Sequence, residues 1–263
     1  IEEREEYEAP VAMGMVVYAG VDYAAILEQA EREADVIVWD GGNNDFSFFR
    51  PDLTIVVVDP LRAGHELKYH PGETNLRMAD AVVVNKIDSA SADQVERVLA
   101  DVASVNPLLT VVRASSPVTL DEGPSLAGRA VLVVEDGPTI THGGLPFGAG
   151  TVAAQAAGAP IRVDPRPYAV GSIAAIYEQY PHIGAVLPAM GYSDEQLREL
   201  EATINAADCD VVVTGTPIDL GRLIESRHPI RHATYELREL GEPSLESVLG
   251  RVITQVRREL VTA

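Results

Sequence analysis

The chain contains little cysteine and no long hydrophobic run, and both shortages exclude classes of protein. Cys209 is the only cysteine among 263 residues, so no internal disulfide framework can form. No apolar run approaches the roughly 20 residues that a membrane-spanning helix needs, and we expect no signal peptide. The sequence therefore predicts a reducing, cytoplasmic setting and no membrane partner.

Positive charge is also scarce. Lys and Arg together number 20 against 40 Asp and Glu, which gives a net charge of -20. Nucleic acid is excluded as a partner because phosphate backbones bind to basic faces. Lys68 and Lys86 are the only lysines. Against this background, residues 62–77 form a local basic cluster of Arg62, His65, Lys68, His70 and Arg77.

The phosphate-binding pattern G-x-x-x-x-G-K-[ST] is absent from these 263 residues. The first residue is Ile1 rather than Met. We therefore expect the chain to be a fragment, with such a loop lying before Ile1.

Three short apolar runs each end in a polar group. VIVW precedes Asp40, IVVV precedes Asp59, and AVVV precedes Asn85 and Lys86. Runs of four residues without alternation are typical of strands buried on both faces. Because parallel strands place ligands at their carboxyl ends, we expect these polar groups to line one crevice.

Strand and helix patterns alternate along the whole chain. This alternation predicts an α/β fold with three-layer parallel sheets. A turn-rich stretch at 115–129 separates two series of elements. We predict an incomplete nucleotide-binding domain over 1–128, followed by a second α/β domain over 129–263. Strands are expected at 15–20 and 36–39 in the first domain, among others.

The NKID sequence at 85–88 is the most informative short motif. Asn85, Lys86 and Asp88 follow a buried strand, as the base-recognition motif does in GTPase-like P-loop proteins. There an Asp carboxylate accepts hydrogen bonds from guanine, and the Lys stem packs over the ring. Ser115, in the ASSP sequence, occupies the place of a small loop against the base. The alternative is a plain loop after a strand.

VIVWDGG resembles a Walker B strand, in which an Asp holds Mg²⁺ directly or through water. Asp40 is the first candidate for this metal and Asp59 the second. The alternative is a turn or capping role for both. None of the six histidines has zinc-site spacing with the single cysteine.

The second half carries the glycine-rich sequence THGGLPFGAGT at 141–151. Glycines before a helix can present backbone N–H groups to an anion, so Gly143 and Gly144 are candidate substrate ligands. His142 and Arg166 could add positive charge. A tight turn is the alternative interpretation.

Six sequence strings, in this order along the chain, resemble the cyclic 2,3-diphosphoglycerate synthetase family. They are VIVWDGGNNDF, VVVDPLRAGHELKYHPGETNLRMAD, VVVNKID, VEDGPTITHGGLPFGAGTVAA, VDPRPYAVGSI and LPAMGY. The resemblance covers nearly the whole chain. It implies an ATP-dependent ligase that joins the two phosphates of 2,3-diphosphoglycerate into a ring, a small anionic substrate, and Mg²⁺. It also implies a P-loop NTPase-like fold with an additional N-terminal domain and phosphate loop.

In this interpretation Asp40, Lys68 and His142 are the catalytic candidates. Nucleotide contacts would come from the NKID residues and Ser115. The substrate would be held by the remaining basic and glycine candidates, namely Arg62, His65, His70, Arg77, Gly143, Gly144 and Arg166.

NKID favours GTP whereas the family resemblance implies ATP, so both nucleotides stay open. The rival functions are a GTPase of switch or metallochaperone type and a non-catalytic module. The sequence does not fix the oligomeric state, a homodimer included.

Overall fold

The computed structural model divides the chain into two compact units, each with its own sheet. The described residues are 2–42, 45–159, 161–190 and 193–262. We call the first unit the NKID unit; it consists of Tyr18–Pro117 and Glu236–Ala263. We call the second the glycine-loop unit; it consists of Ile1–Val17 and Val118–Tyr235. This division differs from the predicted domains, 1–128 and 129–263, because residues 236–263 join the NKID unit.

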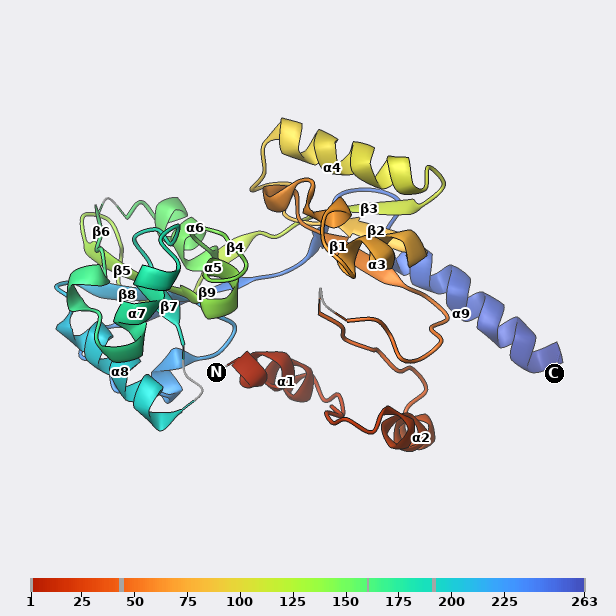
Figure 1. Ribbon diagram of the computed structural model, residues 1–263, viewed down its shortest axis with the longest axis horizontal. Coiled ribbons are helices and arrows are strands. Elements are labelled where there is room, and N and C mark those ends of the chain that lie inside the picture. Colours follow the sequence, from red (N-terminus) through yellow and green to blue (C-terminus); the bar gives the residue numbers. More distant parts are fainter. Residues whose placement is uncertain (1, 43–44, 160, 191–192, 263) are drawn as a thin grey trace. The chain divides into compact units, whose positions relative to one another are not determined.

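The NKID unit is built on a four-stranded sheet in the order β1-β2-β3-β10 (Figure 1). The first three strands are parallel, and β10 runs antiparallel to β3. The strands are β1 (Ile55–Val58), β2 (Ala81–Val84), β3 (Thr110–Ser115) and β10 (Arg238–Glu239). The helices are α2 (Tyr23–Glu33), η1 (Pro60–Arg62), η2 (His65–Leu67), α3 (Gly72–Met78), α4 (Ala92–Val105) and α9 (Leu245–Thr262).

Both faces of this sheet are covered, so the unit has three layers. Val82 and Val84 of β2 pack with buried residues of α3 and α4. Ala81 and Val83 point the other way and pack with Val248 of α9. All four residues of β2 are buried. The unalternating AVVV run is therefore explained by a central strand with a helix layer on each side.

The glycine-loop unit has a six-stranded sheet with the order β4-β9-β8-β5-β6, in which β7 also pairs with β5. Its strands are β4 (Val118–Leu120), β5 (Ala130–Asp136), β6 (Ile161–Arg162), β7 (Leu187–Ala189), β8 (Val211–Gly215) and β9 (Ile230–Tyr235). Its helices are α1 (Glu2–Ala12), α5 (Gly137–Ile140), α6 (Ala149–Ala156), η3 (Arg166–Tyr168), α7 (Gly171–Gln179), α8 (Asp194–Ala206) and η4 (Leu220–Arg222).

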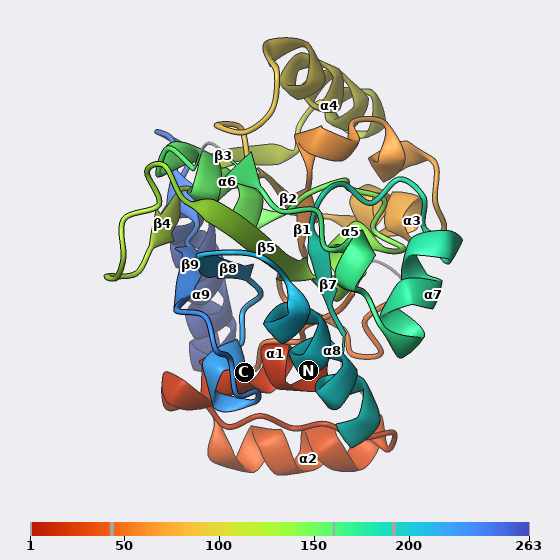
Figure 2. The ribbon, with the colours of Figure 1, turned by 90° about the vertical axis from the view of Figure 1, so that its left-hand side faces the viewer.

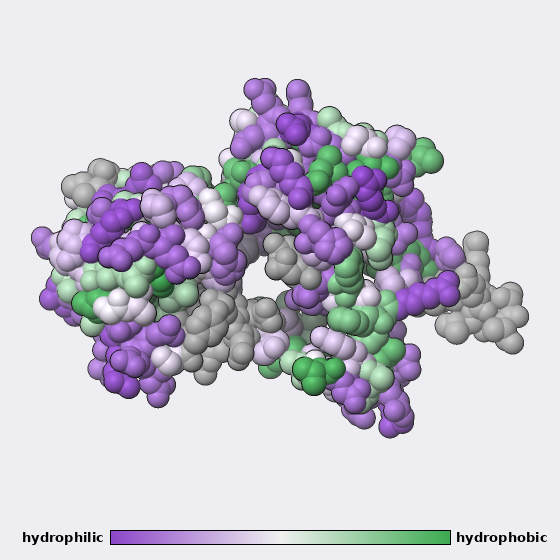
Figure 3. All heavy atoms as spheres, viewed as in Figure 1, coloured by the Kyte–Doolittle hydropathy of each residue, from purple (hydrophilic) through white to green (hydrophobic). Residues whose placement is uncertain are grey.

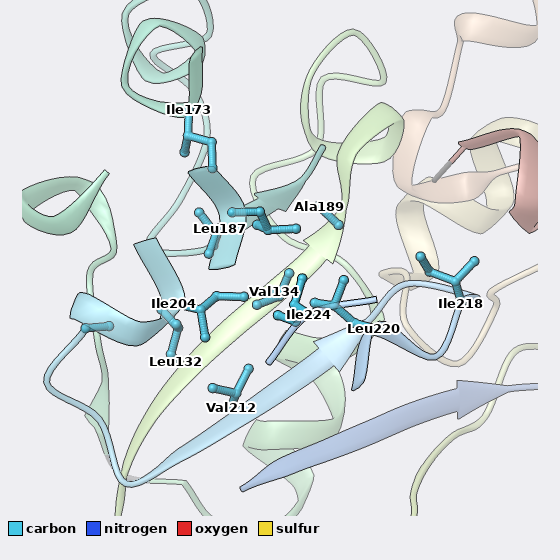
Figure 4. Packing of buried hydrophobic residues seen from close by; sticks show 12 residues of the cluster. Leu132, Val134, Ile173, Leu187, Ala189, Ile204, Val212, Ile218, Leu220 and Ile224 are labelled. Carbon is cyan, nitrogen blue, oxygen red and sulfur yellow. The ribbon is translucent and has the colours of Figure 1, made fainter. Parts of the chain in front are cut away.

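Strand β5 is the centre of this unit's two cores. Leu132 and Val134 pack on one face with side chains of α7 and α8, as Figure 4 shows. Val131 and Val133 pack on the other face with side chains of α5 and α6. The helices therefore lie on both sides of the sheet (Figure 2). The prediction of α/β architecture with three-layer parallel sheets is confirmed.

Two strands expected from the sequence do not form. Residues 15–20 and 36–39 have no strand structure, and hydrophobic side chains of these segments lie exposed. Val38 is 80% exposed, and Figure 3 shows hydrophobic residues on the surface of this part of the NKID unit. A strand requires a hydrogen-bonded neighbour, and β1, at the edge of its sheet, pairs with β2 alone. Within the described ranges, no helix is long and apolar enough to span a membrane.

Candidate functional site

The carboxyl ends of β1 and β2 bring together side chains that are far apart in sequence. Asn85 directly follows β2, and its N–H donates to the Val58 carbonyl at the end of β1 (3.1 Å). The Lys86 ammonium donates to Oδ2 of Asp59 (3.0 Å). Of the three strand ends expected to share one crevice, those at Asp59 and at Asn85 lie together. Asp40 follows no strand, because residues 36–39 do not form one.

Asp88 organises the loop that follows β3. Its Oδ1 accepts a hydrogen bond from the Ser116 N–H (3.0 Å). Ser115, the residue expected near a base, is buried, and its hydroxyl donates to the Arg238 carbonyl (3.2 Å). Ser116 is thus the loop residue that meets the NKID motif. The group of this loop that contacts the motif is the Ser116 backbone N–H rather than the Ser115 hydroxyl.

Asn85 contributes an unusual atom to this site. Within the described part of the chain its buried Oδ1 has no hydrogen-bond partner. An unsatisfied acceptor in a protein interior is costly, which makes it a position where a donor is expected. The exocyclic amino group of a nucleotide base is one such donor.

The two metal candidates lie in different environments. Asp40 is exposed, in the loop that follows residues 36–39. Asp59 already accepts from Lys86, from Arg62 Nη2 (3.1 Å) and from the Leu61 N–H (3.0 Å). A divalent cation on Asp59 would face two positive side chains, so Asp59 does not fit a metal. Among the residues described, no group of three or more His, Cys, Asp or Glu side chains is arranged so that it could hold a metal ion.

Only part of the predicted basic cluster gathers. Partial burial and the charges of Arg62 and Lys68 lower the pKa of His65. Arg77 pairs instead with Glu73 of its own helix (2.7 Å). The His70 ring lies edge-on to Phe46, with centroids 5.5 Å apart. Lys68 is exposed and is therefore accessible to an anionic ligand.

In the glycine-loop unit, the glycine-rich segment is organised around a residue that precedes it in the sequence, Glu135. It lies near the carboxyl end of β5 and is 0% exposed. Its carboxylate accepts four hydrogen bonds from three residues of the α6 N-terminus: Gly148 N–H (2.9 Å), Gly150 N–H (2.9 Å), Thr151 N–H (2.7 Å) and Thr151 hydroxyl (2.7 Å). Burial raises the pKa of Glu135, while these hydrogen bonds act in the opposite direction.

The backbone N–H groups that the sequence offered to a substrate are used internally. Gly143 N–H donates to the Pro138 carbonyl (2.8 Å), and Gly144 N–H donates to the Thr141 carbonyl (3.1 Å). This differs from the predicted role of Gly143 and Gly144 as anion ligands, because tight-turn bonds already occupy both groups. His142 is exposed, and its Nδ1 lies 3.3 Å from the Thr141 hydroxyl.

Arg166 is held by its own surroundings. Its guanidinium pairs with Asp164 (3.0 Å), donates to the carbonyls of Ile183 and Gly184, and lies over the Tyr177 ring. Arg166 therefore connects the segment around Asp164 with the segment at 183–184 of the glycine-loop unit. This arrangement leaves Arg166 a weaker candidate for substrate binding than the sequence indicated.

A second carboxylate fills the N-terminus of α7. Glu199 of α8 accepts hydrogen bonds from the Ser172 N–H (3.0 Å) and from the Ser172 hydroxyl. Ser116, Glu135 and Glu199 are not among the residues predicted from the sequence. The available signal for Glu135 was an acidic residue inside an otherwise apolar strand that precedes a glycine-rich segment. Burial raises the pKa of the Cys209 thiol to about 11, which disfavours the reactive thiolate.

Comparisons with known proteins point to nucleotide chemistry. Residues 28–113 match the family model of the CobW/HypB/UreG nucleotide-binding domain. The arginine synthetase ArcE of Thermococcus kodakarensis is 58% identical over 249 residues, which are 95% of this chain and 56% of that protein. The chain thus spans little more than half the length of this curated relative.

Among solved structures, the chain is similar to the apo form of LpxK from Aquifex aeolicus in complex with ATP. The identity is 12%, the TM-score is 0.33, and the likeness covers 79% of this chain and 53% of that one. A likeness this low carries no functional argument. The family match supports a nucleotide-binding domain of P-loop NTPase type. The narrower resemblance to cyclic 2,3-diphosphoglycerate synthetases stays a prediction.

Proposed function

We propose that this chain is the nucleotide-binding and substrate-binding part of a nucleotide-dependent ligase that forms arginine. The observation that carries the proposal is the 58% identity to an arginine synthetase across 95% of the chain. Asp59 and the NKID motif at 85–88 lie inside the region that matches a nucleotide-binding domain, residues 28–113. The nucleotide is ATP or GTP.

The chemistry proposed is activation by phosphoryl transfer. An oxygen of the precursor accepts the terminal phosphoryl group of the nucleotide, and a nitrogen nucleophile then displaces phosphate to form the carbon–nitrogen bond. Mg²⁺ would neutralise the transferred phosphate, with Asp40 as its candidate ligand. Asn85, Lys86, Asp88 and the Ser116 loop would receive the base. Lys68, with Arg62 and His65 beside it, is the candidate for contact with the phosphates.

Two helix N-termini of the glycine-loop unit are not available as binding sites for the phosphates of a doubly phosphorylated substrate. The helix N-termini of α6 and α7 already hold the carboxylates of Glu135 and Glu199. Phosphate groups bind to such N-termini when the N–H groups are available. These two positions are taken, so they do not supply the phosphate cradle that closure of 2,3-diphosphoglycerate would use.

Formation of cyclic 2,3-diphosphoglycerate is the second candidate function. The long sequence strings that resemble that family favour it, as does the group formed by Arg62, His65 and Lys68. In this case two phosphates must be brought together, which requires several cations as well as Mg²⁺.

One assay separates these functions without knowledge of the precursor. The full-length gene product is supplied with ATP or GTP, labelled phosphate and the corresponding diphosphate. An arginine-forming ligase should incorporate label into the triphosphate only when arginine is present, because each step is reversible. A ring-closing ligase should instead consume nucleotide only with 2,3-diphosphoglycerate. Nucleotide hydrolysis indifferent to both compounds would sink the ligase proposal and favour a switch-type GTPase.

A further inference from the structure

The Asp59 carboxylate joins two cations at the end of the NKID unit's sheet. Its Oδ2 accepts from Lys86 Nζ at 3.0 Å and from Arg62 Nη2 at 3.1 Å. Its Oδ1 accepts from the Leu61 N–H at 3.0 Å. The Asp59 side chain is 15% exposed, and those of Lys86 and Arg62 are about twice as exposed. The acid is therefore the covered centre of the group, and the cations form its solvent side.

The backbone of Lys86 is held in a special conformation. Its φ is +56°, in the left-handed region that a residue with a side chain rarely adopts. Hydrogen bonds hold the backbone on both sides of Lys86. The Asn85 N–H donates to the Val58 carbonyl of β1, and the Ile87 N–H donates to the Ala114 carbonyl of β3. The backbone of Lys86 is thus held in place by hydrogen bonds of its two neighbours to β1 and β3. Its ammonium is anchored separately, on Asp59.

These contacts fix both ends of the Lys86 side chain. The Cα end is set by the strand pairings, and the Nζ end is set by a carboxylate 27 residues earlier in the sequence. The hydrocarbon stem between them is then held in one orientation. A fixed stem is what packing over a planar base requires, since a mobile lysine would lose side-chain entropy on binding.

We propose that Asp59 is a positioning residue for nucleotide binding: it anchors the Lys86 ammonium so that the lysine stem forms one wall of the base site. Asp59 therefore acts through Lys86 and does not bind the metal. This inference rests on the proposed nucleotide site, and it assigns that site a residue outside the NKID motif. Arg62 shares the anchor and gives the three-residue group a net charge of one.

The test is nucleotide affinity measured by calorimetry on the full-length gene product, with and without Mg²⁺. The variants are Asp59→Asn, Lys86→Met, which retains an unbranched apolar stem, and the double variant. Each single variant should lower affinity for the preferred nucleotide roughly tenfold, as expected for a lost charged hydrogen bond. The loss should be the same in both metal conditions. The double variant should bind nucleotide with an affinity no lower than that of the weaker-binding single variant, because both changes break the same Asp59–Lys86 contact.

Asp52→Asn is the matched control, since Asp52 is an exposed carboxylate of the same unit. It should bind nucleotide as the unchanged protein does. If Asp59→Asn does not fold, Asp59→Glu replaces it, because the longer acid keeps the charge and displaces the anchor. That variant should also lose affinity in both metal conditions.

Several results would overturn the inference. A loss for Asp59→Asn that appears only with Mg²⁺ would make Asp59 a metal ligand. Additive losses in the double variant would show that Asp59 does not act through Lys86. Unchanged affinity, or an unchanged protein that binds no nucleotide, would also reject it. Binding as inferred, without arginine-dependent exchange, would reject the ligase proposal alone.

Discussion

At the scale of single residues, Glu135 decides how the glycine-rich segment works. Three glycines surround its carboxylate, and a Cβ built at Gly148, Gly150 or Gly215 would lie 2.4–3.1 Å from Oε2. The glycines therefore leave room for an internal acid. The segment that reads as an anion-binding loop in the sequence binds an anion that the protein itself supplies.

Glu135→Gln should destabilise the glycine-loop unit by about 2–4 kcal/mol. Four donors point at the two carboxylate oxygens. An amide replaces one of these oxygens with an NH₂ group, which opposes the N–H donors and leaves at least one of them unsatisfied. Chemical denaturation followed by circular dichroism measures the change.

Glu122→Gln is the control for this measurement, since Glu122 is an exposed acid of the same unit. Its effect should stay within about 0.5 kcal/mol. Equal stabilities for the two variants would mean that the buried acid does not hold the α6 N-terminus.

At the scale of elements, the approach of β8 to α6 depends on a missing side chain. A Cβ at Gly215 would lie 2.2 Å from the Gly150 backbone nitrogen and 2.4 Å from Glu135 Oε2. Gly215→Ala should therefore cost about 1–3 kcal/mol through overpacking. Gly250→Ala in α9 meets nothing within 4 Å and should add about 0.5–1 kcal/mol by helix propensity.

The same substitution thus has opposite expected signs in two elements, and the pair forms its own control. Denaturation midpoints for the two variants provide the comparison. A destabilisation by both would show that the loss at Gly215 reflects a general intolerance of alanine rather than the contact with Gly150.

The elements that local sequence predicted well are those whose neighbours lie close in the chain. The strands that end before Asp59, before Asn85 and at Ser115 form as expected, and they pair as parallel neighbours, β1 with β2 and β2 with β3. The capping box of Ser91 and Gln94 is present at the start of α4. Residues 36–39 have an equally apolar sequence but form no strand, because apolar character alone does not supply a pairing partner.

The candidate site was predictable to the same extent. Motif order was enough to group Asn85, Lys86 and Asp88. It could not show that Asp59 anchors Lys86, because an Asp after a strand suits a metal and an ion pair equally well. The internal use of the Gly143 and Gly144 amides was also hidden, since glycine spacing is the same in a tight turn and in an anion-binding loop.

At the scale of the whole molecule, the NKID unit is discontinuous in sequence. Strand β10 extends its sheet by pairing with β3, and α9 covers one face through Leu245 and Val248. Helix periodicity revealed α9, but nothing local indicated which sheet it would cover. A helix is amphipathic in the same way whichever unit it packs against, so the assignment of 236–263 required the tertiary structure.

A chain truncated after Tyr235 distinguishes this discontinuous unit from the predicted division at residue 128. Removal of 236–263 uncovers Ala81, Val83, Val112 and Ala114, which are all buried in the intact unit. The NKID unit should then lose protection from hydrogen exchange in β2 and β3, and nucleotide binding with it. Strands β5 and β8 should stay protected, since their two cores contain no residue beyond Tyr235. If β5 and β8 lost protection while β2 kept it, the segment would belong to the glycine-loop unit instead.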